Sequence, residues 1–336
     1  METYVWHLTH GLVARGIEVI VVCEMVIGSP DPNIRLIRVN GEKDRPRWKS
    51  MLAFRKEVSG TICREFKGCK MIIHSHERSI NHQITTFHGP PIEAGNPGLL
   101  VSLLSPRIRA WKRMEQDELL GPSVRMTLAV SSQLLSTLIK QYPALAEKKN
   151  AVAWPGVFRE AGSTDCRNPR ADITRFLFVG QEWKRKGLTT AVELVGEYRR
   201  LKGNASLQIY GVDEVNLPKS FRGIDWLDVK GWVDSVPYSD FDILLHPAKS
   251  EPFGMVVAEA RKHGIPVLMS ANVGAADLGF EKTHAVKLGS SIQAWVDAAT
   301  DLLKSERRLS EVKWTWDDLV DFHIREVYGE VVATEL

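Results

Sequence analysis

The sequence is poor in cysteine, and its cysteines do not form a recognisable metal or redox motif. Its 336 residues include only four, Cys23, Cys63, Cys69 and Cys166. None of them forms a Cys-x-x-Cys pair, and their spacing does not suit metal ligation. We expect reduced, mostly buried thiols, as in a protein of the cytoplasm.

Long apolar runs, targeting signals and repeats are also lacking. The longest apolar stretch, from Ile17 to Gly28, is interrupted by Glu18 and Glu24 and cannot span a bilayer. Met1 is not followed by a basic and then apolar signal peptide. Apolar residues make up 44% and charged residues 25% of the chain, as in ordinary globular proteins. The length allows two domains with separate cores.

The net charge of +3 is unevenly distributed. Residues 1–160 carry a balance of +7, and residues 161–336 carry −4. A basic half suits anionic phosphates or an anionic membrane surface, although a solvated basic face explains the charge equally well. The basic segments are Arg35 to Lys56 and Arg107 to Arg113. Since they lack a recognition motif, we do not expect a nucleic-acid partner.

The most informative stretch runs from Asp242 to Asp277. An apolar strand ending at Pro247 precedes a predicted helix that starts near Pro252, and Gly264 ends that helix before a second strand. Unpaired amides at the helix start, at Gly254, Met255 and Val256, suit a phosphate group. Glu259 lies roughly 7–9 Å further on, at about 1.5 Å per residue, which is close to the distance from a diphosphate to its ribose. An ordinary helix in which Glu259 pairs with a basic neighbour is the alternative.

Two glutamates separated by seven residues, Glu251 and Glu259, follow a strand that ends in proline. This pattern resembles the nucleotide-sugar site of the retaining glycosyltransferases of family 4, which have the two-domain GT-B fold. The form His246-Pro247-Ala248 is most similar to the glucosyltransferases of the lipopolysaccharide core. The resemblance implies that Glu259 holds the ribose and that Glu251 contacts the donor sugar.

A second motif follows the predicted strand from Arg175 to Gly180. A basic loop then leads to Gly187 and a helix, an arrangement that places cations beside a diphosphate. The resemblance assigns Gly180, Arg185 and Lys186 to this role, although the chain has Gln181 where many family members have arginine. A solvated basic loop is the alternative.

The family reads the nucleotide base near the strand from Asp228 to Val233, which implies that Trp232 and Val233 lie in the donor site. Asp240-Phe241-Asp242 has the form of a metal-binding Asp-x-Asp motif. It precedes a buried strand, and the family uses no metal at this place. We therefore expect neither a metal nor a cofactor, and we expect the nucleotide sugar to be a UDP-sugar that serves as a substrate.

Histidines are concentrated in the first half, at His74, His76, His82 and His88. Their spacing over two strands and a loop argues against zinc. His88 lies where a strand meets a Gly-Pro-Pro loop, and parallel sheets bind ligands at such carboxyl ends. The family has a histidine near the donor sugar at a similar place, which implies a catalytic role for His88. A structural histidine is the alternative.

The first half begins with a helix over residues 1–14 and a strand over residues 17–23. In the resembled family a strand and a Gly-Gly loop precede this helix, and Glu2 matches a glutamate just after that loop. We therefore expect an open gap in the first sheet, and stabilisation when a strand is added ahead of Met1.

Together these features predict an α/β protein of two doubly wound, Rossmann-like domains that face a cleft, with the first strand missing. The predicted parts are an acceptor-side domain (1–157), a linker (158–172), a nucleotide-sugar domain (173–312) and a terminal helix returning to the first domain (313–336). The predicted function is transfer of a hexose from a nucleotide-diphosphate sugar to a glycan or lipid-linked acceptor, on the inner face of the membrane. An epimerase of the same fold, or an inactive binding remnant, is the alternative. A phosphorylase would need a pyridoxal-phosphate lysine, which is not found.

Overall fold

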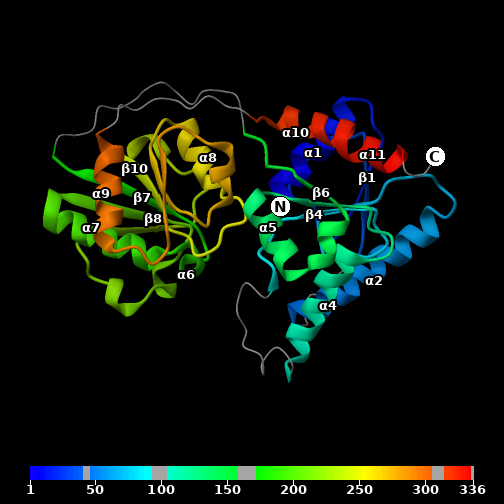
Figure 1. The fold of residues 1–336 in the computed structure, drawn as a ribbon, viewed down its shortest axis with the longest axis horizontal. Helices are drawn as coiled ribbons and strands as arrows, with labels where there is room; N and C mark the ends of the chain where they lie inside the picture. The colour runs from blue at the N-terminus through cyan, green and yellow to red at the C-terminus, as the bar shows by residue number, and fades with distance from the viewer. Residues whose placement is uncertain (41–45, 93–103, 158–171, 305–313, 334–336) are drawn as a thin grey trace. The chain divides into compact units, whose positions relative to one another are not determined.

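The computed structural model describes all residues except 41–45, 93–103, 158–171, 305–313 and 334–336 (Figure 1). The chain forms two compact units. Unit 1 contains Met1–Gly156 and Trp314–Leu336, and unit 2 contains Val157–Lys313. The expected linker lies almost entirely outside the described residues. The predicted α/β class with parallel sheets is confirmed.

Unit 2 is built on a six-stranded parallel sheet of order β12-β11-β10-β7-β8-β9. The strands are β7 (Thr174–Val179), β8 (Ala205–Tyr210), β9 (Leu227–Gly231), β10 (Ile243–His246), β11 (Val267–Ser270) and β12 (Thr283–Val286). The order reverses between β7 and β10, because the chain leaves β9 and returns to pair with β7. Parallel sheets bind ligands outside the carboxyl ends of strands at such a reversal.

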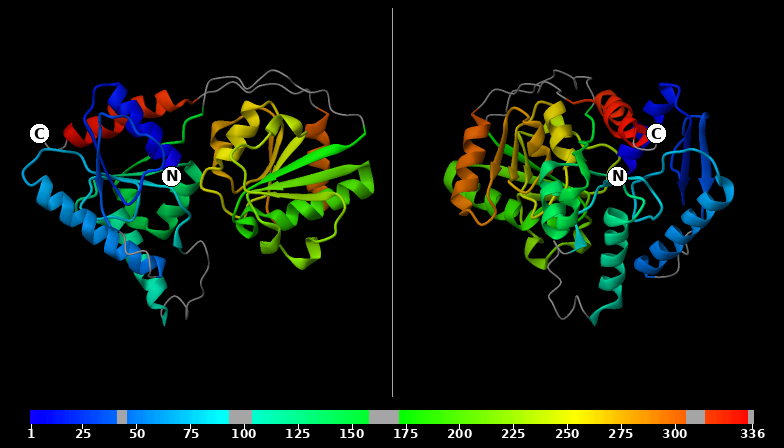
Figure 2. Two further views of the ribbon diagram at one scale, coloured as in Figure 1. Left: turned by 180° about the vertical axis from the view of Figure 1, so that it is seen from behind. Right: turned by 45° about the vertical axis from the view of Figure 1, so that its right-hand side comes forward.

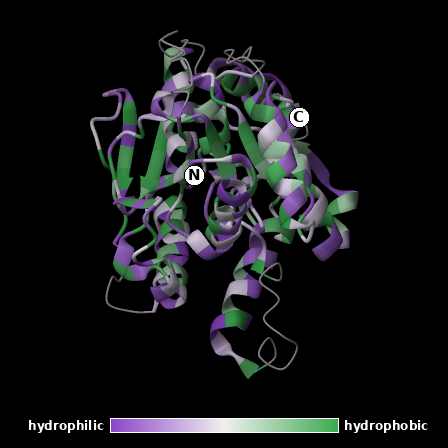
Figure 3. Ribbon diagram, turned by 90° about the vertical axis from the view of Figure 1, so that its left-hand side faces the viewer, coloured by the Kyte–Doolittle hydropathy of each residue, from purple (hydrophilic) through white to green (hydrophobic). Residues whose placement is uncertain are grey.

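Helices cover both faces of this sheet. They are α6 (Trp183–Lys186), α7 (Leu188–Lys202), α8 (Met255–Lys262) and α9 (Ile292–Leu303). Phe176 and Phe178 of β7 join α7 and α9 in one core, whereas Leu177, which points to the opposite face, is also fully buried. Helix α8 packs against β10 and β11. Every residue of the central strands β10 and β11 is buried, which explains why they are almost entirely apolar; apolar residues are green in Figure 3.

The strands described in unit 1 form two separate parallel sheets. One joins β1 (Val19–Cys23) to β2 (Ile34–Arg38), and the other has the order β3-β4-β5-β6. The second sheet consists of β3 (His74–Ser75), β4 (Ile84–Phe87), β5 (Met126–Ala129) and β6 (Lys149–Val152). The described strands of unit 1 thus do not join into one sheet, and the gap at the missing strand stays a prediction. Strand β3 lies at the edge of the second sheet, and the Ile73 carbonyl just before it accepts from the amide of Gln83 at 3.0 Å.

The helices of unit 1 match the sequence only in part. Helix α1 (Glu2–Ala14) lies where it was predicted. Helices α4 (Pro106–Leu120) and α5 (Ser132–Gln141) follow, and Ser131 caps α5 by accepting from the amide of Leu134. Strand β2 and α2 (Arg47–Glu65) were missed within the stretch interpreted only as basic. Within the described residues, no helix combines the length and hydrophobicity that crossing a bilayer requires.

The end of the chain packs against its beginning. Helix α10 (Trp316–Phe322) packs against α1. A π-helix (His323–Tyr328) and α11 (Gly329–Ala333) continue from α10, and Figure 2 shows this segment beside α1. Arg15 pairs with Asp317 and Asp321 at 3.1 and 2.7 Å. A Cβ at Gly11 would lie 2.4 Å from Val320, so this glycine lets the two helices approach closely.

Candidate donor-binding site

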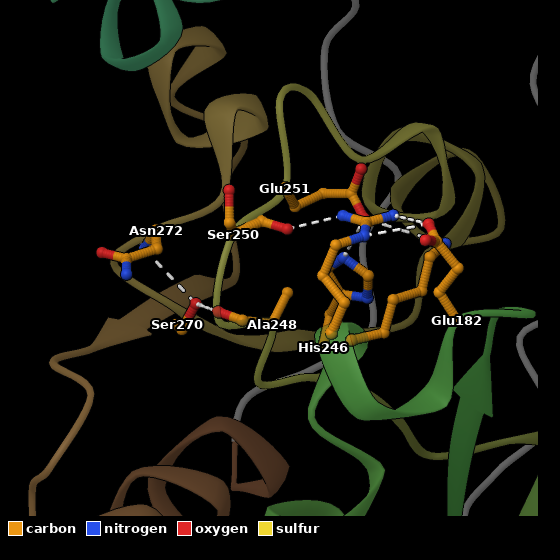
Figure 4. A network of polar contacts seen from close by, with 9 residues as sticks. Glu182, His246, Ala248, Ser250, Glu251, Ser270 and Asn272 are labelled. Carbon is orange, nitrogen blue, oxygen red and sulfur yellow. Dashed lines mark hydrogen bonds and ion pairs between the residues drawn. The ribbon is translucent and has the colours of Figure 1, made fainter. Parts of the chain in front are cut away.

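Glu251 lies at the centre of a polar network in unit 2 (Figure 4). It follows the carboxyl end of β10, and its backbone pairs with the loop after β11. Its amide donates to the carbonyl of Asn272, and its carbonyl accepts from the amide of Gly274, both at 3.0 Å. Ser270 and Asn272 brace the same two loops, because their side chains donate to the carbonyls of Ala248 and Lys249. These hydrogen bonds fix the Glu251 backbone between the loops that follow β10 and β11.

Three nitrogen-bearing side chains surround the Glu251 carboxylate. Its Oε2 lies 3.3 Å from Arg185 Nη1, 3.8 Å from Lys186 Nζ and 3.5 Å from His246 Nε2. Burial raises the pKa of Glu251, but His246 and the charges of Lys186 and Arg185 outweigh it and lower the pKa to about 2. Glu251 is therefore an anion at any working pH, which suits hydrogen-bond acceptance rather than proton donation.

His246 is a site residue that the sequence reasoning did not assign. It is fully buried at the end of β10, and burial lowers its pKa, although the contact with Glu251 acts in the opposite direction. A neutral imidazole beside Glu251 can donate one N–H to the carboxylate. The quoted His-Pro-Ala pattern was the available signal, because it placed a histidine directly before the loop of Glu251.

Arg185 and Lys186 lie on the short helix α6, which is fixed to the loop after β10. The amide of Lys249 donates to the carbonyl of Arg185 at 2.8 Å. Gly187 (φ +81°) follows, where a Cβ would lie only 2.0 Å from the carbonyl oxygen of Pro247. This close approach requires glycine. The loop that was predicted to carry cations therefore has a defined position beside Glu251.

Gly180 makes room for the Lys186 side chain. It has φ +154°, and a Cβ there would lie 2.1 Å from Lys186 Cδ. Lys186 thus crosses the carboxyl end of β7 with its ammonium group toward Glu251. Gly180, Arg185, Lys186 and Glu251 are brought together as the sequence predicted, and their role in binding remains a prediction.

Helix α8 begins at Met255, three residues later than the predicted start at Pro252. Gly254, with φ +99°, is its N-cap, and the amide of Ala275 donates to the carbonyl of Phe253 at 2.7 Å. Gly254, Met255 and Val256 thus form the helix start beside Glu251. Their phosphate-binding role remains a prediction.

Glu259 lies one turn further along α8 and is exposed at the surface. Its Oε2 accepts a hydrogen bond from the Tyr238 hydroxyl at 2.5 Å. Tyr238 is only 5% exposed and stacks on His263. Burial, then the Glu259 charge, raises the pKa of Tyr238, so the tyrosine stays a neutral donor. The sequence reasoning missed Tyr238, which lies 21 residues away and carries no motif.

Trp232 and Val233 directly follow β9. Gly231, with φ +70°, turns the chain here, and Trp232 is 66% exposed. An exposed indole at the carboxyl end of a parallel strand is available to stack on a ring. Asp242, part of the rejected metal motif, accepts a hydrogen bond from the Arg175 amide at 2.7 Å. Within the described ranges, no His, Cys, Asp or Glu side chains are grouped closely enough to hold a metal.

His88 belongs to unit 1 and follows β4. Its Nε2 lies 3.0 Å from His76 Nδ1, and His74 bonds to Thr86 and Tyr328 at 2.8 and 3.0 Å. His323, from the terminal segment, lies 3.3 Å from the Tyr4 hydroxyl. His88 is thus one member of a cluster of four histidines, namely His74, His76, His88 and His323, and its catalytic role is untested.

This histidine cluster predicts that unit 1 loses stability in acid. Burial, followed by the charges of His323 and the amino terminus, lowers the pKa of His76 to about 3, and burial lowers that of His323 to about 4. Since these lie below the unfolded value of about 6.5, the unfolded chain binds protons first as the pH falls. Each such histidine removes up to about 1.4 kcal/mol of stability per pH unit below 6.5.

Urea unfolding between pH 7.5 and 5 would measure this loss. Replacing the exposed His284 with glutamine should leave the pH slope unchanged, whereas His323→Gln should reduce it. A stability independent of pH below 6.5 would contradict the prediction.

The geometry described so far is that of the GT-B glycosyltransferases: parallel α/β units with paired glutamates and a basic loop beside one sheet. Comparisons with known proteins agree. The family described as Glycosyltransferase Family 4 matches residues 1–160, and that described as Glycosyl transferases group 1 matches residues 173–305. The chain belongs to the family 4 glycosyltransferases, as the sequence predicted.

Individual relatives are distant. The glycogen synthase of Mycobacterium tuberculosis (strain CDC 1551 / Oshkosh) is 25% identical over 226 residues, which are 60% of this chain and 52% of that protein. The chain spans about half the length of the curated relatives it matches.

Several solved structures resemble nearly the whole chain. WaaG, a glycosyltransferase of lipopolysaccharide biosynthesis, superposes with a TM-score of 0.70 at 18% identity, covering 98% of this chain and 94% of its own. Anabaena HepE in complex with UDP and glucose gives 0.60 at 11% identity, covering 99% and 95%. At these identities the likeness shows the fold alone.

Proposed function

We propose that the protein is a retaining hexosyltransferase that moves a hexose from a UDP-sugar to a glycan or lipid-linked acceptor. The observation that carries the proposal is the anionic Glu251 between Arg185, Lys186 and His246, beside the start of α8. The family match supports the reaction class, and the UDP and glucose bound by HepE support the donor.

The site residues have separate roles in this proposal. Arg185, Lys186 and the amides at Gly254, Met255 and Val256 meet the diphosphate charge that develops as the bond to the sugar breaks. Glu251 accepts hydrogen bonds from hydroxyls of the donor sugar.

The remaining contacts hold the nucleoside and the sugar. Glu259 accepts from the ribose, and Trp232 and Val233 line the base. Gly180 leaves room for the Lys186 side chain, and the family resemblance assigns a catalytic role to His88 of unit 1. A strong general base is not needed if the leaving phosphate deprotonates the acceptor on the same face.

Turnover of purified full-length chain would test the proposal. UDP- and GDP-hexoses are first ranked by thermal shift, and UDP release is then measured with and without glycan acceptors, with NMR of the product anomer. Acceptor-dependent release with retained configuration is expected. Release of UDP from the donor alone would favour an epimerase, and binding without turnover would favour an inactive remnant.

We also propose that unit 1 attaches to the inner face of the membrane. Exposed cations lie on α2 and α4, namely Arg47, Lys49, Lys56, Arg107, Arg109 and Arg113. Leu52 and Leu104 are exposed near them, at 40% and 74%. Arg55, by contrast, is 6% exposed and pairs with Asp117, so it is not available to lipid. Lys43 and Arg45 lie outside the described residues.

We predict binding to anionic vesicles that weakens as salt rises, since it rests on screened charges. Sedimentation with phosphatidylglycerol vesicles measures it. The pair Lys49→Glu and Lys56→Glu should abolish most binding, whereas Lys202→Glu with Lys287→Glu in unit 2 should preserve most of it. Equal binding to neutral vesicles would contradict the prediction.

A further inference from the structure

Neighbouring protein groups accept hydrogen bonds from all three nitrogens of the Arg185 guanidinium. Arginine has five N–H donors, which form two edges that can each bind an anion in a bidentate way. Nε and Nη2 both donate to one oxygen, Glu182 Oε2, at 2.9 and 2.7 Å. Nη1 donates to the Ser250 carbonyl at 2.5 Å and reaches Glu251 at 3.3 Å. Figure 4 shows Ser250 and Glu182 apart, with the Glu251 carboxylate between them.

A phosphate binds arginine best in a bidentate way, through two hydrogen bonds from one edge of the guanidinium. Glu182 occupies the edge formed by Nε and Nη2, and the Ser250 carbonyl occupies part of the other. A diphosphate therefore gains a paired contact with Arg185 only if one of the present partners leaves.

The three partners differ in how readily they can leave. The Ser250 carbonyl is backbone, fixed in the loop of Glu251. The Glu251 side chain is 11% exposed and also contacts Lys186 and His246. The Glu182 side chain is 66% exposed, and an ion pair so exposed is weak. Glu182 can therefore swing into solvent at the smallest cost.

We infer that Glu182 is an internal competitor of the donor diphosphate: it binds the Arg185 guanidinium and is displaced when a nucleotide diphosphate binds. The inference rests on the proposed function, in which the diphosphate meets Arg185. Its consequence is that Glu182 lowers affinity for anionic nucleotides and speeds release of the UDP product. The affinity for uridine, which lacks phosphates, does not depend on Glu182.

The test is calorimetry of the full chain with UDP and with uridine. Glu182→Gln should tighten UDP binding about twofold to fivefold, the range of an exposed ion pair, and leave uridine binding unchanged. A matched control exists on α7, where Glu197 accepts from Arg200 Nε and Nη2 at 2.8 and 2.6 Å. Glu197→Gln removes the same charge from a similar exposed ion pair and should change neither affinity.

A double-mutant cycle separates displacement from general repulsion between Glu182 and phosphate. If Glu182 acts through Arg185, Glu182→Gln should have no effect on UDP affinity once Arg185→Ala is present. A gain of equal size in both backgrounds overturns the inference, as does weaker UDP binding by Glu182→Gln, which would make Glu182 a positioning residue.

Failure of the inference differs from failure of the proposed function. If Arg185→Ala weakens UDP binding and Glu182→Gln leaves it unchanged, only the competitor role is overturned. If wild-type protein does not bind UDP at all, both fall.

Discussion

Replacing Lys186 with alanine should lower the turnover of the UDP-sugar about a hundredfold, the usual cost of losing one group that stabilises transition-state charge. The ammonium lies 3.8 Å from Glu251 and crosses Gly180, beside the predicted diphosphate site. Negative charge on the leaving diphosphate grows as the sugar departs, so the loss should exceed the loss in ground-state binding. Uridine affinity should not change.

Steady-state kinetics with calorimetry would measure both quantities. Lys184 is the control, because it lies two positions earlier, is exposed, and rests over the Trp183 ring. Lys184→Ala should keep near-normal turnover. Equal losses for uridine and UDP-sugar in Lys186→Ala would show that the lysine maintains the loop rather than the diphosphate.

The second large effect is expected at Glu259. Glu259→Ala should weaken UDP binding by about 1.5–3 kcal/mol for each ribose hydrogen bond lost, since the acceptor is charged. The carboxylate is presented at the surface of α8, with Oε2 engaged by Tyr238 and Oε1 on the other side of the group. The affinity for 2′,3′-dideoxy-UDP should be nearly the same in the variant and the wild type.

Calorimetry with both nucleotides tests the ribose role directly. Glu193, exposed on α7, supplies a charge-matched control in the same unit, and Glu193→Ala should not alter either affinity. If Glu259→Ala weakens both nucleotides equally, the residue does not read the ribose hydroxyls.

Local patterns predicted parts of unit 2 well, because apolar strands and glycine turns leave signals within short stretches of sequence. The run from Arg175 to Gly180 became β7, and the glycines at 180 and 187 marked close approaches that only glycine permits. The missed elements have a physical explanation. Strand β2, Ile34–Arg38, has two arginines among three aliphatic residues and no strict period of two, so it lacked the usual signal of a half-exposed strand.

The site was predictable where function constrains spacing along the chain, and not where contacts come from afar. Glu251 and Glu259 share one segment, and Arg185 and Lys186 share another. Tyr238 contacts Glu259 from 21 residues away, and no spacing rule points to it. The His76–His88 pair likewise depends on two parallel strands being neighbours.

Unit 1 is discontinuous in sequence, and this fixes an order of events during synthesis. Unit 2 occupies an unbroken stretch, Val157–Lys313, while the contacts of His323 with Tyr4 and of Tyr328 with His74 join residues 319 and 254 positions apart. A ribosome delivers all of unit 2 before it delivers Trp314. Nascent unit 1 must therefore keep the partner face of α1 uncovered while its neighbour folds, the interval in which a chaperone would have most to protect.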